Sequence, residues 1–276
     1  MTSTRLRAMV DACHPGPSVT VTVVITALAA AAGRSGVGLA VVAAAALTGQ
    51  LSVGWCNDAN DADRDRGASR TGKPTVRGDV TAGFLWRAAI VALAATIALS
   101  FLAAGPVGGT AHVVAVLSAW TYNLLLKTTI FSALPYAVSF GLVPAFVTYG
   151  LTPPSAPPIW LVVTCALLGV SAHLANAIPD VHSDELVGAG GVVAAVGVRI
   201  ASIAALVCLV IAVGLLAAHL DVAPVVAVGL VLVAAVGAVV VAVRDQGRGQ
   251  ALFRYVMVLA VVAVLLILLS ARALSS

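Results

Sequence analysis

Long apolar segments dominate this chain and constrain its fold more than any other feature. A helix that crosses a bilayer needs roughly 20 apolar residues. Nine segments come close to that length, near residues 18–33, 37–56, 81–103, 110–126, 130–150, 159–178, 192–218, 223–243 and 251–271. None alternates in polarity as the strands of a membrane barrel do. The sequence therefore predicts an all-α, polytopic membrane helical bundle of about nine transmembrane helices.

Composition excludes the other broad classes. Hydrophobic residues make up 61% of the chain and charged residues only 9%, whereas soluble domains carry about 25% charged residues. The four cysteines have no metal-binding or disulfide-framework spacing. No run of like charges suggests a nucleic-acid partner. We therefore expect one membrane domain over residues 1–276, with a cytoplasmic N-terminal tail of about 15 residues.

The basic residues predict the orientation. With nine spans, all of the 15 lysines and arginines except Arg34 and Arg272 fall on the side of the N-terminus. Cytoplasmic loops of membrane proteins carry this excess. We expect an integral protein of the inner cell membrane, with the N-terminus cytoplasmic, the C-terminus outside and cytoplasmic polar loops capping a central cavity.

The first acidic motif lies in the polar run after the second span. Asp58, Asp61 and Asp65 have the spacing i, i+3, i+7, which places three carboxylates on one stripe of a helix. Asn57 lies one turn before Asp61, whereas Asp63 lies off the stripe and is expected to be solvated. Like charges at this spacing repel one another, so the pattern favours a bound divalent cation. Oxygen ligands favour magnesium, manganese or calcium.

A second motif repeats this pattern after the sixth span. Asn176, Asp180 and Asp184 have the spacing i, i+4, i+8, with Pro179 as a candidate kink. Both motifs lie on the same predicted membrane face. Two rows of oxygen ligands facing one another are typical of a paired metal site that grips a diphosphate.

Basic residues near the two motifs are candidate diphosphate ligands. Lys127 ends the fourth span, and Arg66, Arg70 and Lys73 follow the first motif. Arg64, Arg77, Arg244 and Arg248 are expected to be orientation charges. His182 lies between Asp180 and Asp184 but off their face. The other four histidines belong to no motif and are expected at core or interface positions: His14, His112, His173 and His219.

Together these motifs resemble the UbiA-type superfamily of intramembrane prenyltransferases. The family pattern Asn-Asp-x-x-Asp-x-x-x-Asp is matched from Asn57 to Asp65, and the second pattern by Asp180 and Asp184 after Asn176. The segment Arg70-Thr71-Gly72-Lys73-Pro74 is similar to Arg-Thr-x-x-Arg-Pro, with lysine in place of the second arginine. The segment from Tyr122 to Lys127 is similar to the Tyr-x-x-x-x-Lys element, with Thr128 where arginine often follows.

The resemblance implies an Mg²⁺-dependent prenyltransferase that acts on an isoprenyl diphosphate and a lipophilic or aromatic acceptor, in contact with membrane lipid. It implies that the metal ligands are Asp58, Asp61, Asp65, Asp180 and Asp184. The implied catalytic residues are Asp61, Asp65, Asp184 and Lys127. The implied diphosphate-binding residues are Asn57, Arg66, Arg70, Lys73, Lys127, Tyr122 and Asn176.

The acceptor and the prenyl chain length stay open at this point. Aromatic residues of the spans could line a pocket or shield a carbocation: Trp120, Tyr122, Tyr136, Phe140 and Tyr149. The main alternative is a UbiA-type terpene cyclase that acts on the isoprenyl diphosphate alone. A cation transporter is a second alternative, but it predicts acids near mid-span. A CDP-alcohol phosphatidyltransferase would need a glycine-rich signature that the sequence lacks.

Overall fold

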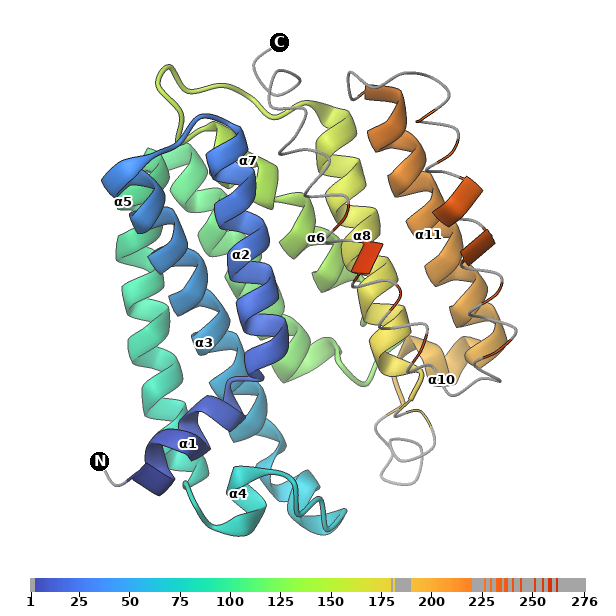
Figure 1. The fold of residues 1–276 in the computed structure, drawn as a ribbon. Helices are drawn as coiled ribbons and strands as arrows, with labels where there is room; N and C mark the ends of the chain where they lie inside the picture. The colour runs from blue at the N-terminus through green and yellow to red at the C-terminus, as the bar shows by residue number, and fades with distance from the viewer. Residues whose placement is uncertain are drawn as a thin grey trace.

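The computed structural model describes residues 3–179, 181, 190–219 and scattered residues between 226 and 262. This part of the chain is helical and contains no strand. The helices form a bundle in which most axes run in a common direction (Figure 1). Their bounds are α1 Ser3–Ala12, α2 Pro15–Ala31, α3 Gly36–Gly67, α4 Pro74–Arg77, α5 Ala82–Thr121, the π-helix η1 Tyr122–Leu126, α6 Leu134–Gly141, α7 Val143–Thr148, α8 Ile159–Ala177, α10 Val192–Val196 and α11 Val198–His219.

Helix α3 extends well past the apolar segment that predicted it. It has 32 residues, which gives a length of about 48 Å at 1.5 Å per residue. The hydrocarbon core of a bilayer is only about 30 Å thick. The helix therefore continues through the first acidic motif to Gly67, and the motif lies on a rigid helix. We call this end of the bundle, which contains Asp58, Asp61 and Asp65, the acidic end.

Helix α5 contains two of the predicted spans. Gly105 has φ 63° and ψ −165° inside it, and Pro106 follows. This conformation is one that only glycine adopts readily, and proline cannot donate the next helical hydrogen bond. The chain reverses at this point: a Cβ atom on Gly109 would come within 3.0 Å of the backbone of Phe101. The Gly-Pro break predicted between the third and fourth spans is confirmed.

Four described helices are long and apolar enough to cross a membrane: α3, α5 with η1, α8 and α11. The pair α1 and α2, bent by 63°, would be a fifth. The predicted span 130–150 consists of the two short helices α6 and α7, which meet at Leu142 just before Pro144. The eighth and ninth predicted spans lie mostly outside the described residues, so the count of nine stays a prediction.

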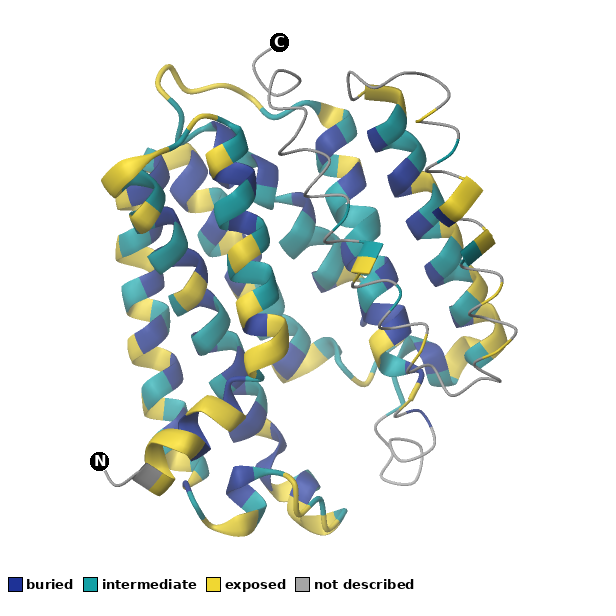
Figure 2. Cartoon of the chain, in the orientation of Figure 1, coloured by how far each residue is buried: buried dark blue, intermediate teal, exposed yellow. Residues whose placement is uncertain are grey.

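Apolar side chains fill the core and also cover the sides of the bundle. Phe146, Leu161 and Leu216 belong to a buried cluster that joins α2, α3, α5, α7, α8 and α11. Large apolar side chains are also exposed on the helix faces, including Val91 at 69% and Leu102 at 72%, and Figure 2 shows exposed residues along these outer faces. An apolar exterior of this size is expected when the surrounding medium is lipid. The described helices thus form an all-α membrane bundle, as predicted.

Candidate active site

The acidic stripe of α3 faces inward. Asp58, Asp61 and Asp65 are 0%, 4% and 1% exposed, respectively, which is the common face that the spacing predicts. Asp63 is exposed, as expected for a residue off the stripe, and pairs with Arg66 at 2.7 Å. Buried carboxylates are costly without partners. Each carboxylate of the stripe accordingly contacts a basic side chain.

Lys127 brings the fourth span to this stripe. Its Nζ atom contacts the Asp61 carboxylate and lies 3.1 Å from Oδ1 of Asn57. Two amides attach the preceding π-helix η1 to α3. Asn123 Nδ2 donates to the Val53 carbonyl at 3.0 Å, and Asn60 Nδ2 donates to the Asn123 carbonyl at 2.9 Å. The Tyr-x-x-x-x-Lys element and the first acidic motif therefore form one site, although neither Asn60 nor Asn123 was singled out from the sequence.

The segment after the first motif folds back onto the same stripe. Arg70 Nη1 lies 3.2 Å from Oδ1 of Asp65, and Lys73 Nζ lies 2.6 Å from Oδ1 of Asp58. Arg64, expected only as an orientation charge, lies 3.3 Å from Oδ1 of Asp61. The Arg66 side chain is 61% exposed and pairs with Asp63. The structure thus places Arg70 and Lys73 among the buried carboxylates and places Arg66 outside them.

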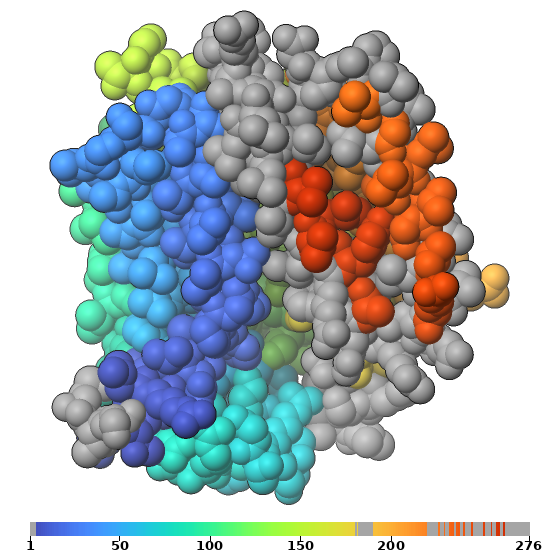
Figure 3. Space-filling model, in the orientation of Figure 1, coloured from blue at the N-terminus to red at the C-terminus, as the bar shows by residue number. Residues whose placement is uncertain are grey.

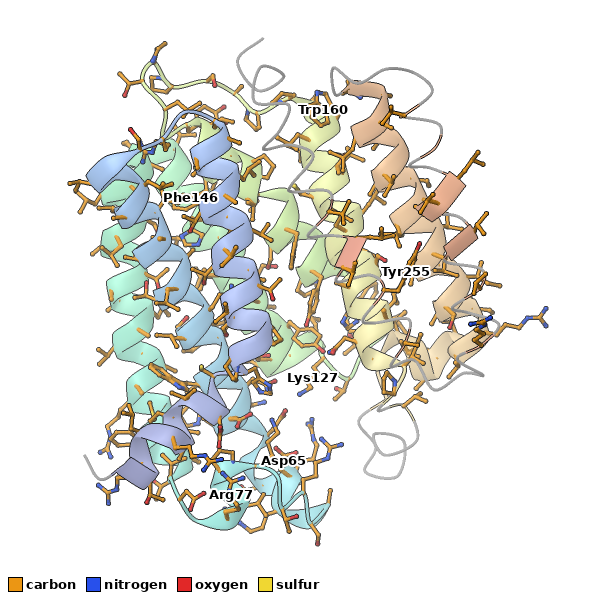
Figure 4. All side chains as sticks on the ribbon, viewed as in Figure 1. Asp65, Arg77, Lys127, Phe146, Trp160 and Tyr255 are labelled. Carbon is orange, nitrogen blue, oxygen red and sulfur yellow. The ribbon has the colours of Figure 1, made fainter. Side chains whose placement is uncertain are left out.

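Arg77 joins α4 to the N-terminal helix. Its Nε atom donates to Asp79 at 2.7 Å, and its Nη2 atom lies 3.3 Å from Oδ2 of Asp11. The hydrogen bond to Asp79 raises the pKa of the Arg77 guanidinium. Figure 4 shows Asp65, Arg77 and Lys127 at the same end of the bundle, and Phe146 and Trp160 toward the other.

Two buried carboxylate oxygens have no partner in the described part of the chain. They are Oδ2 of Asp58 and Oδ2 of Asp65. Unpaired buried oxygens are unfavourable, and a magnesium ion accepts carboxylate oxygens and waters as ligands. These residues therefore fit the metal that the motif predicts. Among the described residues alone, no group of three His, Cys, Asp or Glu side chains is arranged to hold a metal ion.

The second acidic motif is described only in part. Asn176 is exposed near the end of α8. Asp180 and Asp184 lie outside the described residues, so their predicted approach to Asp61 stays a prediction.

Ser132 connects neighbouring segments: its hydroxyl lies 3.0 Å from Nε2 of His173 on α8 and accepts the Val192 N–H at 3.2 Å.

Aromatic rings cluster around Tyr136. The rings of Tyr122 and Tyr136 are 5.1 Å apart and edge-on, and His173 stacks on Tyr136 at 4.6 Å. Phe140 extends this stack at 6.3 Å from Tyr136. Trp120 instead donates to Ser52 at 3.2 Å, on the α3 side. The rings expected to line a pocket are therefore distributed over more than one part of the bundle.

His14 is the main site residue that the sequence did not indicate. Its Nε2 atom lies 3.0 Å from Oδ1 of Asp58, 3.3 Å from Nζ of Lys73 and 3.4 Å from Nδ2 of Asn57. The one available signal was its place, because it directly precedes the first span and so falls on the predicted cytoplasmic face. The segment expected as a tail forms helix α1, which packs on α3 through Ala8, Met9 and Ala12.

The model of the UbiA prenyltransferase family matches residues 18–262 of this chain. No curated protein matches the sequence.

Solved structures share the fold at low sequence identity. A UbiA homolog from Archaeoglobus fulgidus, bound to DMAPP and Mg²⁺, has a TM-score of 0.76 at 15% identity and covers 96% of this chain and 98% of that one. A UbiA homolog from Aeropyrum pernix K1 has a TM-score of 0.69 at 20% identity, covering 91% and 97%. A digeranylgeranylglyceryl phosphate synthase structure has a TM-score of 0.71 at 12% identity, covering 97% and 98%. At these identities the likeness concerns the fold.

Proposed function

This chain belongs to the UbiA prenyltransferase family, and from that premise we propose that it transfers an isoprenyl group from an isoprenyl diphosphate to a lipophilic or aromatic acceptor, with magnesium as cofactor and pyrophosphate as product. The family match confirms the resemblance carried by the acidic motifs. The A. fulgidus homolog with DMAPP and Mg²⁺ supports the substrate class and the metal. The apolar helices and the family make this an integral membrane protein.

The observation that carries the proposal is the meeting of Lys127 with Asn57 and Asp61. It joins a fixed positive donor to a row of buried carboxylates at one end of an apolar bundle. A diphosphate needs both: cations to neutralise its charge, and carboxylates to hold a divalent cation against it. A water-filled ion path would place the acids near mid-span, so this arrangement favours an enzyme over a transporter.

The metal would be held by Asp58, Asp61 and Asp65, together with Asp180 and Asp184 of the second motif. When bound, it would neutralise diphosphate charge as a Lewis acid. In our proposal Lys127, Arg70 and Lys73 donate hydrogen bonds to the diphosphate oxygens, and Asn57, which also accepts from Lys127, and Tyr122 bind the diphosphate beside them. Asn176 would contribute from the end of α8, and Arg66, which pairs with exposed Asp63, would make only a weak contact from the outer side.

The reaction then proceeds by ionisation. The allylic C–O bond breaks, its electron pair leaves with the diphosphate, and a resonance-stabilised carbocation remains. The positive side chains stabilise the leaving group as its charge develops, and each tenfold in rate needs about 1.4 kcal/mol of such preferential stabilisation. The acceptor captures the cation and releases a proton. Apolar walls keep water from capturing it first.

Orientation and acceptor belong to the same proposal. We place the acidic end at the cytoplasmic face of the inner cell membrane, with the N-terminus inside and the C-terminus outside. The rings of Tyr122 and Tyr136, one of them on the π-helix that leads to Lys127, could shield a cation through their faces. Cyclisation of the isoprenyl chain without an acceptor is the alternative outcome.

The direct test is product analysis. Membranes containing the protein are incubated with labelled geranyl, farnesyl and geranylgeranyl diphosphates, and products are identified by mass. A prenylated lipophilic acceptor and stoichiometric pyrophosphate support the proposal. A cyclic hydrocarbon with no acceptor supports the cyclase. Membranes that release no pyrophosphate from any of the three substrates would rule out both.

A further inference from the structure

His14 stands at the junction between α1 and α2 and reaches the acidic stripe from outside it. It is the residue before α2, with φ 54° and ψ 68° in the left-handed region. Its side chain is 41% exposed, whereas that of Asp58 is fully buried. We propose that His14 is a positioning residue: its imidazole holds one oxygen of Asp58 so that the other stays directed to the metal–diphosphate site. This inference rests on the proposed function.

The two oxygens of Asp58 have different surroundings. Oδ1 lies 3.0 Å from Nε2 of His14 and 2.6 Å from Nζ of Lys73. Oδ2 is buried and has no partner in the part of the chain that the structure describes. A lysine ammonium is a point charge on a flexible stem and does not by itself define an orientation. The rigid imidazole supplies the second, directional hydrogen bond, which fixes the carboxylate plane and keeps Oδ2 available.

The junction that carries His14 is tightly seated on α3. A Cβ atom on Gly54 would lie 2.6 Å from the Cys13 carbonyl oxygen, so the chain contacts the bare backbone of α3 there. The Ser18 hydroxyl donates to the same carbonyl at 2.6 Å, and Trp55 Nε1 donates to the Met9 carbonyl at 2.9 Å. Figure 3 shows the N-terminal segment against the end of α3 and α4 on one face of the molecule. These contacts fix the backbone next to His14 against α3.

The same imidazole lies within reach of the neighbouring donors. Asn57 Nδ2 lies 3.4 Å from Nε2 of His14, and Asn57 Oδ1 accepts from Lys127 at 3.1 Å. Nε2 of His14 also lies 3.3 Å from Nζ of Lys73. Because Nε2 donates to Asp58 in this proposal, its approaches to these two donor nitrogens are close contacts and not hydrogen bonds. Loss of His14 is expected to loosen Asp58 first, because Lys127 keeps its own contact with Asp61.

Three substitutions at position 14 separate the side-chain role from the turn. In His14→Gln the amide nitrogen can occupy the place of Nε2. In His14→Asn the shorter amide cannot reach Asp58, but asparagine accepts the left-handed backbone. His14→Ala removes the donor and also suits this backbone poorly. Trp55→Phe is the matched control, because it removes an α1–α3 hydrogen bond and leaves His14 in place.

The measurement is calorimetric titration of the detergent-purified full chain with inorganic pyrophosphate in the presence of magnesium, which needs no turnover. We expect His14→Asn and His14→Ala to bind about tenfold more weakly than wild type, a change of about 1.4 kcal/mol. His14→Gln and Trp55→Phe should stay within about threefold. Thermal melts check that all variants fold. If His14→Ala does not fold, the conclusion rests on His14→Asn.

If His14→Asn bound magnesium pyrophosphate as tightly as wild type, the positioning role would be overturned, and residue 14 would serve only to form the turn before α2. If Trp55→Phe lost as much pyrophosphate affinity as His14→Asn, the positioning role would also be overturned, because the packing of α1 on α3 would then explain both losses. Failure of His14→Gln to recover binding would count against the Nε2 hydrogen bond. If wild type itself bound no magnesium pyrophosphate, the proposed function would fail and this inference with it, whereas binding by wild type and all variants alike would overturn this inference alone.

Discussion

The Nζ atom of Lys127 lies 3.1 Å from Oδ1 of Asn57, a residue 70 positions earlier in the chain. This contact unites the end of α3 with the end of the π-helix η1, and it places a positive charge among three buried carboxylates. In a medium of low dielectric, the lysine and the buried carboxylates are strongly coupled, because each of these charges is stabilised by its neighbours of opposite sign.

Asp61 is the carboxylate shared by Lys127 and Arg64. We expect Asp61→Asn to lower pyrophosphate release at least about 100-fold, because an amide cannot compensate these cations or hold a divalent ion. Asp63→Asn is the control, since Asp63 is exposed beside the same stripe, and it should change the rate less than about threefold. Equal rates for wild type and Asp61→Asn would contradict the proposed site. Asp184→Asn is expected to behave like Asp61→Asn.

Arg70 and Arg66 form a second matched pair. Arg70 contacts buried Asp65, whereas Arg66 pairs with exposed Asp63. We expect Arg70→Ala to lower kcat/KM for the prenyl diphosphate about 10- to 100-fold, the effect of losing one charge-assisted hydrogen bond. Arg66→Ala should lower it less than about threefold. A large loss in Arg66→Ala would show that this side chain turns inward when substrate binds.

Magnesium removal should stop catalysis without unfolding the chain. The unpaired oxygens of Asp58 and Asp65 suit a cation, whereas the helices are held by apolar packing that needs no metal. We expect a chelator to abolish pyrophosphate release, added magnesium to restore it, and the far-ultraviolet circular dichroism to stay unchanged throughout. Full turnover in excess chelator would argue against a metal at this site.

Gly105 tests the turn between the arms of α5. Its φ of 63° and ψ of −165° belong to a region that costs a side chain about 1–3 kcal/mol. Gly105→Ala should therefore lower the thermal unfolding midpoint. Gly83→Ala is the control, because Gly83 has ordinary helical geometry and nothing within 4 Å of an added Cβ, and it should be neutral or stabilising. A midpoint unchanged in Gly105→Ala would mean that the turn can relax.

Much of the fold could be predicted because its signals are local. Segment length and hydropathy indicated membrane helices, and Gly105-Pro106 indicated a break inside what the structure describes as α5. The i, i+3, i+7 spacing predicted the common buried face of Asp58, Asp61 and Asp65. These properties depend on residues within a few turns of one another, so a single sequence is enough to infer them.

Contacts between distant segments could not be inferred in the same way. Nothing in the spacing links His14 to Asp58, or Asn60 to the Asn123 carbonyl, because such pairs depend on how helices pack. The residue types and their periodicity thus define the helices and the kind of chemistry, whereas helix packing selects which polar groups meet, since that choice rests on three-dimensional distances that no local pattern encodes.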